Sequence, residues 1–114
     1  MTERLPSLDP LLHQPARTQL VAFLSARGEA SFADLKRALG VTDGNLGAHL
    51  NKLVAAGLVS ALETGGRGRA QTLYRLTDAG KRALAEYVHH LSTLMDLGTT
   101  ADQDQPLGSR IREV

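Results

Sequence analysis

"SFADLKRALGVTDGNLGAHLNKLVAAGL", residues 31–58, is the stretch that decides the fold of this 114-residue chain. Ser31 is a predicted helix N-cap, and Gly40 is expected to end the helix that follows. Thr42 is the predicted N-cap of a second helix, which we expect to end at Gly57. Because only about two residues separate these helices, they must meet at a steep angle, which is typical of a helix-turn-helix.

Further elements are expected on both sides of this helix pair. Pro15 begins a preceding helix, which Gly28 is expected to end. Two short strands are predicted after the pair, LVSALE from Leu58 and QTLYRLT up to Thr77, and they would form a β-hairpin. A last helix starts at Thr77 and is expected to end at Gly98. This order predicts an α+β, mainly α, fold: a winged helix-turn-helix with three helices, a β-hairpin wing and a long C-terminal helix.

The predicted hairpin tip, GGRGRA at residues 65–70, is the centre of a basic segment. Residues 65–82 contain five Lys or Arg and one Asp, a local charge of +4 in a chain whose net charge is +1. The glycines suggest a nucleotide-binding loop, but such a loop opens a helix, and here a strand follows. We therefore expect Arg67 and Arg69 to contact DNA phosphates or a minor groove, with Arg75 adding to the patch. A mobile, solvated loop is the alternative.

The helix that begins after Thr42 has an apolar and a polar side. At about 100° per residue, Leu46, Leu50, Leu53 and Val54 are expected to face the core, and Gly47 at their edge is expected to admit the preceding helix closely. Small residues let the polar side enter a groove, where Asn, His and Lys bond to base edges or phosphates. The helix N-terminus can hold a phosphate. The residues expected to contact DNA are Thr42, Gly44, Asn45, Ala48, His49 and Lys52. A merely solvated face is the alternative for each.

The last helix carries an apolar stripe that a small core cannot cover along ~30 Å. We expect a second copy of the chain to bury it, which would place two recognition helices ~34 Å apart on DNA. The residues expected at this dimer contact are Leu8, Leu11, Leu12, Leu84, Tyr87, Val88, Leu91, Leu94 and Met95. In the alternative, the N-terminal segment folds back over this helix.

Enzymatic, metal-binding and membrane functions find no support in the sequence. The chain has no cysteine and four histidines. Two of these, His89 and His90, are adjacent and point about 100° apart, and neither HExxH nor a nucleophile elbow occurs. We therefore expect no catalytic residue, metal or cofactor. No apolar run reaches ~18 residues, and no signal-peptide pattern occurs, so we expect a cytoplasmic protein. The domain is expected to span residues 1–97, followed by a polar, mobile tail over 98–114.

From about Leu8 to Leu97 the chain resembles the short winged-helix transcriptional regulators of bacteria and archaea, which are related to the MarR and ArsR groups. The motifs that carry the resemblance are SFADLKRALGVTDGNLGAHLNKL, AAGLV and YRLTDAGKRAL. The resemblance implies homodimeric DNA binding, with residues 42–57 as recognition helix and 65–71 as wing. ArsR metal sensors typically use cysteines, which this chain lacks. MarR proteins are usually longer, with a larger region for dimerisation and ligands.

These observations predict a homodimeric, sequence-specific DNA-binding regulator of transcription, acting as a repressor that occludes a promoter. Its expected partners are double-stranded DNA and a second copy of itself. A cavity between the first and last helices could admit an apolar or aromatic effector, and the sequence leaves this open. The alternative function is a winged-helix protein–protein interaction module without direct DNA binding, which the near-neutral net charge allows.

Overall fold

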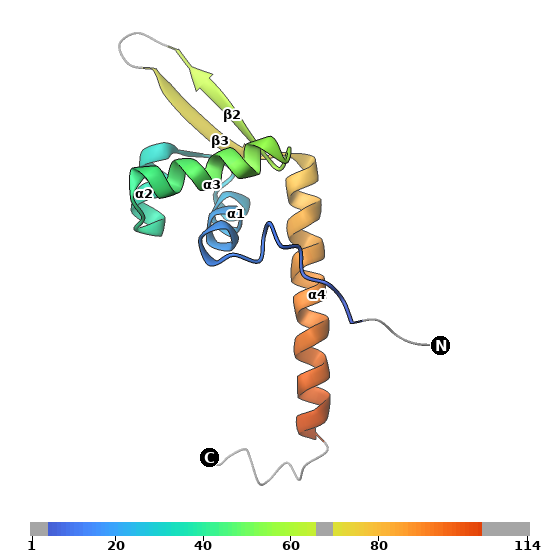
Figure 1. The fold of residues 1–114 in the computed structure, drawn as a ribbon. Coiled ribbons are helices and arrows are strands. Elements are labelled where there is room, and N and C mark those ends of the chain that lie inside the picture. The colour runs from blue at the N-terminus through green and yellow to red at the C-terminus, as the bar shows by residue number, and fades with distance from the viewer. Residues whose placement is uncertain (1–4, 66–69, 104–114) are drawn as a thin grey trace.

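The computed structural model describes residues 5–65 and 70–103 and confirms the predicted, mainly helical winged helix (Figure 1). In this part of the chain, four helices and a three-stranded antiparallel sheet follow one another. The elements in chain order are α1 (Pro15–Arg27), β1 (Ala30–Ser31), α2 (Phe32–Leu39), α3 (Asp43–Ala55), β2 (Val59–Thr64), β3 (Gln71–Leu76) and α4 (Asp78–Gln103).

The two helices of the central stretch begin and end where their capping residues predict. The Ser31 hydroxyl accepts a bond from the Asp34 amide at 3.1 Å, and the Asp34 carboxylate accepts one from the Ser31 amide at 3.2 Å, which completes a capping box. Gly40 ends α2 in the left-handed conformation, with φ 66°. The Thr42 hydroxyl then accepts from the Asn45 amide at 3.1 Å and caps α3. These local bonds fix the turn between α2 and α3.

The sheet has the strand order β1-β3-β2. Strands β2 and β3 form the predicted hairpin, with Val59 opposite Leu76 at its base. Strand β1 was not predicted, because two residues are too few to show an alternation of apolar and polar side chains. It is a strand only because Ala30 pairs with Tyr74, far along the chain. Strand β1, which lies between α1 and α2 in the chain, therefore joins these helices to the β2–β3 hairpin.

The core is built mainly from leucines, most of them on α1, α2 and α3, and α4 contributes Tyr87. In the described chain its buried members are Leu12, Leu20, Val21, Leu24, Ala30, Leu35, Leu46, Leu50, Leu53, Val59, Leu76 and Tyr87. Branched aliphatic side chains dominate because the sequence has few aromatic residues. This packing is the main source of the fold's stability.

The N-terminal segment packs against α4. This is the arrangement that was given above as the alternative to a dimer contact. Asp9 caps a short turn by accepting a bond from the Leu11 amide at 2.9 Å. This turn carries Leu12 into the core, where it is 1% exposed, and brings His13 to within 2.9 Å of the Tyr87 hydroxyl. Leu12 and Tyr87 are therefore covered by their own chain, which corrects their assignment to a dimer surface.

Two helical glycines, Gly47 and Gly80, differ in the space around them, and only Gly47 had been expected to allow a close approach. A Cβ atom added at Gly47 would meet nothing within 4 Å, so this glycine does not serve the close helix approach expected of it. At Gly80, in contrast, a Cβ would lie 2.1 Å from the Leu58 carbonyl oxygen. The close contact of the fold is thus between the first turn of α4 and the start of β2.

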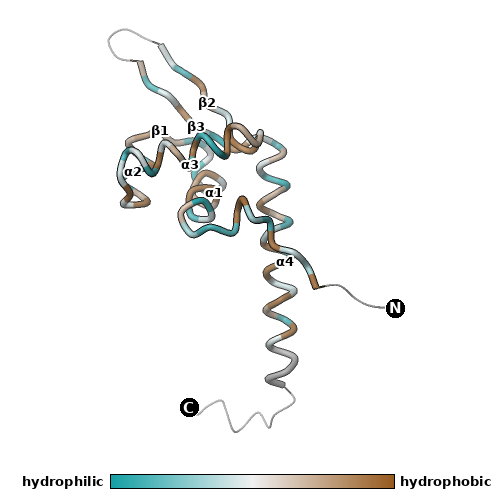
Figure 2. Tube along the Cα trace, in the orientation of Figure 1, coloured by the Kyte–Doolittle hydropathy of each residue, from teal (hydrophilic) through white to brown (hydrophobic). Residues whose placement is uncertain are grey.

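Helix α4 continues to Gln103, past the end that we expected at Gly98. A helix-interior glycine costs only about 1 kcal/mol relative to alanine and does not by itself end a helix. Hydrophobic and hydrophilic segments alternate along α4 (Figure 2). Of the helices in the described ranges, none is long and apolar enough to cross a membrane. The predicted tail beyond residue 103 lies outside those ranges.

Candidate nucleic-acid interface

The outward face of α3 presents small and polar residues. Leu46, Leu50 and Leu53 are at most 2% exposed and anchor the helix on the core, whereas Val54, which was expected beside them, is 39% exposed. The other side is exposed and includes Gly44, Asn45, Ala48, Asn51 and Lys52. Figure 1 shows α3 on the outside of the domain, with the β2–β3 hairpin rising beside it. This arrangement lets the first half of α3 enter a major groove, where such side chains contact base edges.

The N-terminus of α3 is exposed at Thr42, and the acidic residue that follows, Asp43, is paired with a lysine. Thr42 is exposed at the N-cap, where free helix amides and the helix dipole favour an anion. Asp43 would repel a phosphate, but Lys36 of α2 lies 2.8 Å from its carboxylate. Both partners are largely exposed, so this pair adds little to stability. It offsets the negative charge at the surface that would face DNA.

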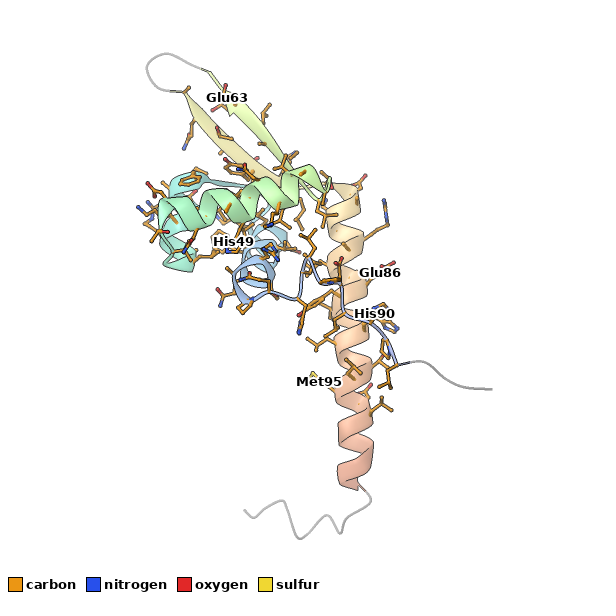
Figure 3. All side chains as sticks on the ribbon, in the orientation of Figure 1. His49, Glu63, Glu86, His90 and Met95 are labelled. Atoms are coloured by element: carbon orange, nitrogen blue, oxygen red, sulfur yellow. The ribbon has the colours of Figure 1, made fainter. Side chains whose placement is uncertain are left out.

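His49 lies at the edge of this face and contacts α1. Figure 3 shows His49 on the side of α3 that faces α1, and its Nδ1 atom is 3.2 Å from the Arg17 Nη1 atom. The ring is half-buried. Burial lowers the pKa of His49, and the positive charges of Arg17 and Lys52 lower it further. His49 therefore favours its neutral form. Sequence reasoning missed Arg17, because no local pattern pairs residues 32 positions apart.

Arg75, which the sequence grouped with the wing arginines, is paired with an acidic side chain. Its guanidinium is 3.0 Å from the Glu29 carboxylate. It lines a cavity of about 480 Å³ formed by α1, β2, β3 and the start of α4, with no α3 residue in its wall. The contribution of Arg75 to a positive patch is thus offset by Glu29. Arg67 and Arg69 lie outside the described residues.

The residues expected at the dimer contact differ in exposure. Leu8, Leu11, Leu84, Leu91 and Leu94 are half-buried. Val88 and Met95 are 54% and 63% exposed, and Leu97, which was not predicted, is 50% exposed. The distal half of α4, which carries Met95, extends away from the rest of the domain (Figures 1 and 3). An apolar surface thus follows α4 beyond the core.

A second cavity lies where the sequence left an effector open, between the start of α1 and α4. It measures about 400 Å³. Its walls include His13, Thr18, Gln19 and Tyr87. The lining combines the rings of His13 and Tyr87 with the polar side chains of Thr18 and Gln19.

Comparison with known proteins agrees with this geometry. A family model described as a winged helix DNA-binding domain matches residues 16–95. The uncharacterised protein MJ0432 of Methanocaldococcus jannaschii is 31% identical over 84 residues, which are 74% of this chain and 91% of that protein.

Two solved structures show the same fold. The transcriptional regulator homologue protein from Pyrococcus horikoshii OT3 is 29% identical with a TM-score of 0.72, over 75% of this chain and 85% of its own. A mutant MarR from E. coli, complexed with operator DNA, is 20% identical with a TM-score of 0.63, over 85% of this chain and 79% of its own. At that identity the likeness to MarR concerns the fold alone. On the match of the family model and of the M. jannaschii protein, this chain belongs to the winged helix DNA-binding domain family.

Proposed function

We propose that the protein is a homodimeric, sequence-specific DNA-binding regulator of transcription, which acts as a repressor by occluding a promoter. The observation that carries the proposal is the outward face of α3. Its first half is exposed, small and polar, while its opposite side is anchored by buried leucines. In this proposal α3 enters the major groove, with Asn45, Ala48 and His49 at base edges and Lys52 at a base or phosphate.

The wing supplies affinity in this proposal and the helix supplies sequence preference. The hairpin places residues 65 and 70 at the far end of β2 and β3, beyond the domain (Figure 1). Arg67 and Arg69, which lie between them in sequence, would neutralise phosphates on the duplex. Phosphate contacts position a protein on DNA without reading its sequence.

A second copy of the chain would bind along α4. Leu84, Val88, Leu91 and Met95 recur at spacings of four, three and four residues, as in the seam between two packed helices. Val88 and Met95 are exposed in the single chain, so a partner would remove apolar surface from water. A two-fold dimer of this kind would present two α3 helices to consecutive major grooves.

The direct test is a gel-shift titration with fragments of the DNA upstream of the protein's own gene, at a stated salt concentration. We expect retardation of some fragments and not of others at moderate salt. Asn45→Ala should change which fragments bind best, because Asn pairs with adenine through its N6 and N7 atoms. An equal loss on every fragment would remove Asn45 from base reading.

One observation favours the second candidate, a protein-interaction module. Within the described ranges, Lys36 pairs with Asp43 and Arg75 with Glu29, so part of the basic surface is already neutralised. A partner protein would then bind the same face of α3. No retardation of any fragment at moderate salt would favour this candidate over DNA binding.

A further inference from the structure

The contact between Arg17 and His49 has a consequence for what α3 can read. Arg17 lies on α1 and is held in place from two sides. Its Nε atom donates to the Leu11 carbonyl at 2.7 Å, and its backbone amide donates to the Gln14 side chain at 2.8 Å. Its remaining guanidinium edge reaches His49 Nδ1, 3.2 Å away. The guanidinium is thus aimed at the ring by the N-terminal segment.

This geometry fixes the direction of the hydrogen bond. A guanidinium has five N–H donors, has no acceptor and stays protonated in proteins. The Nδ1 atom of His49 must therefore accept with its lone pair, so the proton of the neutral ring lies on Nε2. A ring protonated at both nitrogens would turn an N–H toward the Arg17 N–H, and the neighbouring Lys52 adds to the positive surroundings.

The Nε2 donor of His49 lies among the α3 residues that are predicted to contact bases. Asn45, His49 and Lys52 are separated by four and three residues, so they form one row along α3. Among the described residues, no group is hydrogen-bonded to His49 Nε2, whereas Nδ1 is occupied by Arg17. The free nitrogen is on the far side of the ring from Arg17.

We propose that Arg17 is a positioning residue for base recognition: by donating to Nδ1 it makes His49 a hydrogen-bond donor at Nε2, which selects a base with a major-groove acceptor and rejects cytosine. Guanine offers N7 and O6, adenine N7 and thymine O4, whereas cytosine offers only its N4 amino group there. This inference rests on the proposed function, because it requires α3 to lie in the major groove.

A competing role for Arg17 is direct contact with a DNA phosphate. The two roles differ in what a variant changes. Removal of a phosphate contact weakens binding about equally on all sequences and lowers the salt slope by about 1. Removal of a positioning residue changes the base preference at one position of each half-site and leaves the other positions as they were.

The first part of the test uses the free protein. The ring nitrogens of His49 are observed by NMR with 15N-labelled histidine at neutral pH, in the wild type and in Arg17→Met. We expect an unprotonated Nδ1 and a protonated Nε2 in the wild type, and a mixture of tautomers in the variant. Arg82→Met, which removes the same charge from an exposed site on α4, should leave the ring unchanged. A wild-type ring protonated at Nδ1, or a ring unaffected by Arg17→Met, would overturn the proposal.

The second part selects duplexes from a random DNA pool with the wild type, Arg17→Met, Arg17→Lys and His49→Ala. Wild-type protein should disfavour cytosine at one position per half-site by on the order of tenfold. Arg17→Met and His49→Ala should lose this preference at the same position, and Arg17→Lys should lose less of it, because an ammonium group is also only a donor. A phosphate role predicts instead that Arg17→Met binds all duplexes more weakly and keeps the wild-type motif, which would overturn the proposal.

The outcomes separate this inference from the proposed function. Failure to enrich any duplex would contradict both the proposed function and base reading by His49, although the NMR result on the ring would stand. An enriched motif whose base preferences are the same in wild type and Arg17→Met would contradict only the inference.

Discussion

Gly80 shows how a single residue can be essential for packing without any recognisable motif. The Leu58 carbonyl accepts a bond from the Thr77 amide at 3.0 Å, directly beside the first turn of α4. A Cβ at residue 80 would lie 2.1 Å from this oxygen and 3.2 Å from Leu76 Cδ2. Backbone atoms cannot move aside as a flexible side chain can. The junction between the sheet and α4 therefore requires a glycine here.

Substitution of two helical glycines tests this view of the fold. Gly80→Ala should lower the free energy of unfolding by about 1–3 kcal/mol, the usual cost of overpacking. Gly47→Ala is the matched control. Its Cβ meets no atom within 4 Å, so the variant should gain about 0.5–1 kcal/mol from helix propensity. Chemical denaturation at one fixed protein concentration measures both. Equal effects of the two substitutions would contradict the close contact at Gly80.

His49 gives a second prediction at the residue scale, in the dependence of stability on pH. Burial lowers its pKa in the folded protein, so below its ordinary value of about 6.5 the unfolded chain binds a proton more readily. The contribution of His49 to stability is therefore complete above about pH 6.5 and is lost as the pH falls through the folded pKa.

The comparison of wild type with His49→Asn isolates this contribution. The difference between their unfolding free energies should be constant above about pH 6.5 and should shift in favour of the variant at lower pH. Denaturant titrations at a series of pH values measure it. A difference that does not vary with pH would show that the folded protein leaves the His49 pKa unchanged.

At the scale of elements, the sequence predicts what is determined locally. The starts of α2 and α3 could be predicted from Ser31 and Thr42. A hydroxyl at the N-cap accepts a hydrogen bond from a backbone amide two or three residues further along the chain, which otherwise has no partner. Elements defined by distant contacts escape this reasoning. Strand β1 exists through its pairing with β3, and the Arg17–His49 contact joins α1 to α3. Such contacts depend on tertiary packing, which no short window of sequence contains.

The wing is the element whose predicted role is purely electrostatic. Replacing Arg67 and Arg69 by Ser should weaken binding to all duplexes alike. The logarithm of the binding constant should also depend less steeply on the logarithm of salt concentration, by about 0.9 for each phosphate that is no longer neutralised. Fluorescence anisotropy at several salt concentrations measures this slope. Arg82→Ser, which removes one positive charge from an exposed site on α4, is the control. An unchanged slope in the double variant would remove the wing from the DNA interface.

At the scale of the whole molecule, the N-terminal segment and α4 together determine which apolar surface is left for a partner. Leu12 and Tyr87 are buried by the chain itself, whereas the sequence could not decide between folding back and dimerisation. Val88 and Met95 remain 54% and 63% exposed. The apolar stripe predicted from the helical period is real, but only its outer and distal parts are available to a second copy.

Charged substitutions on that stripe test the proposed dimer. Val88→Glu combined with Met95→Glu should convert the protein to a monomer, because two carboxylates would be buried without partners at the interface. His89→Glu lies on the same helix about 100° from Val88 and should leave the dimer intact. Light scattering coupled to gel filtration measures the mass. A wild-type protein with the mass of one chain at every concentration would contradict the proposal.

Two copies of this chain should read DNA through α3, and selection of bound duplexes from a random pool measures this in one experiment. We expect an enriched, near-palindromic motif whose half-site centres lie one helical turn, ~34 Å, apart. No enrichment at moderate salt, with the protein folded and dimeric, would contradict it.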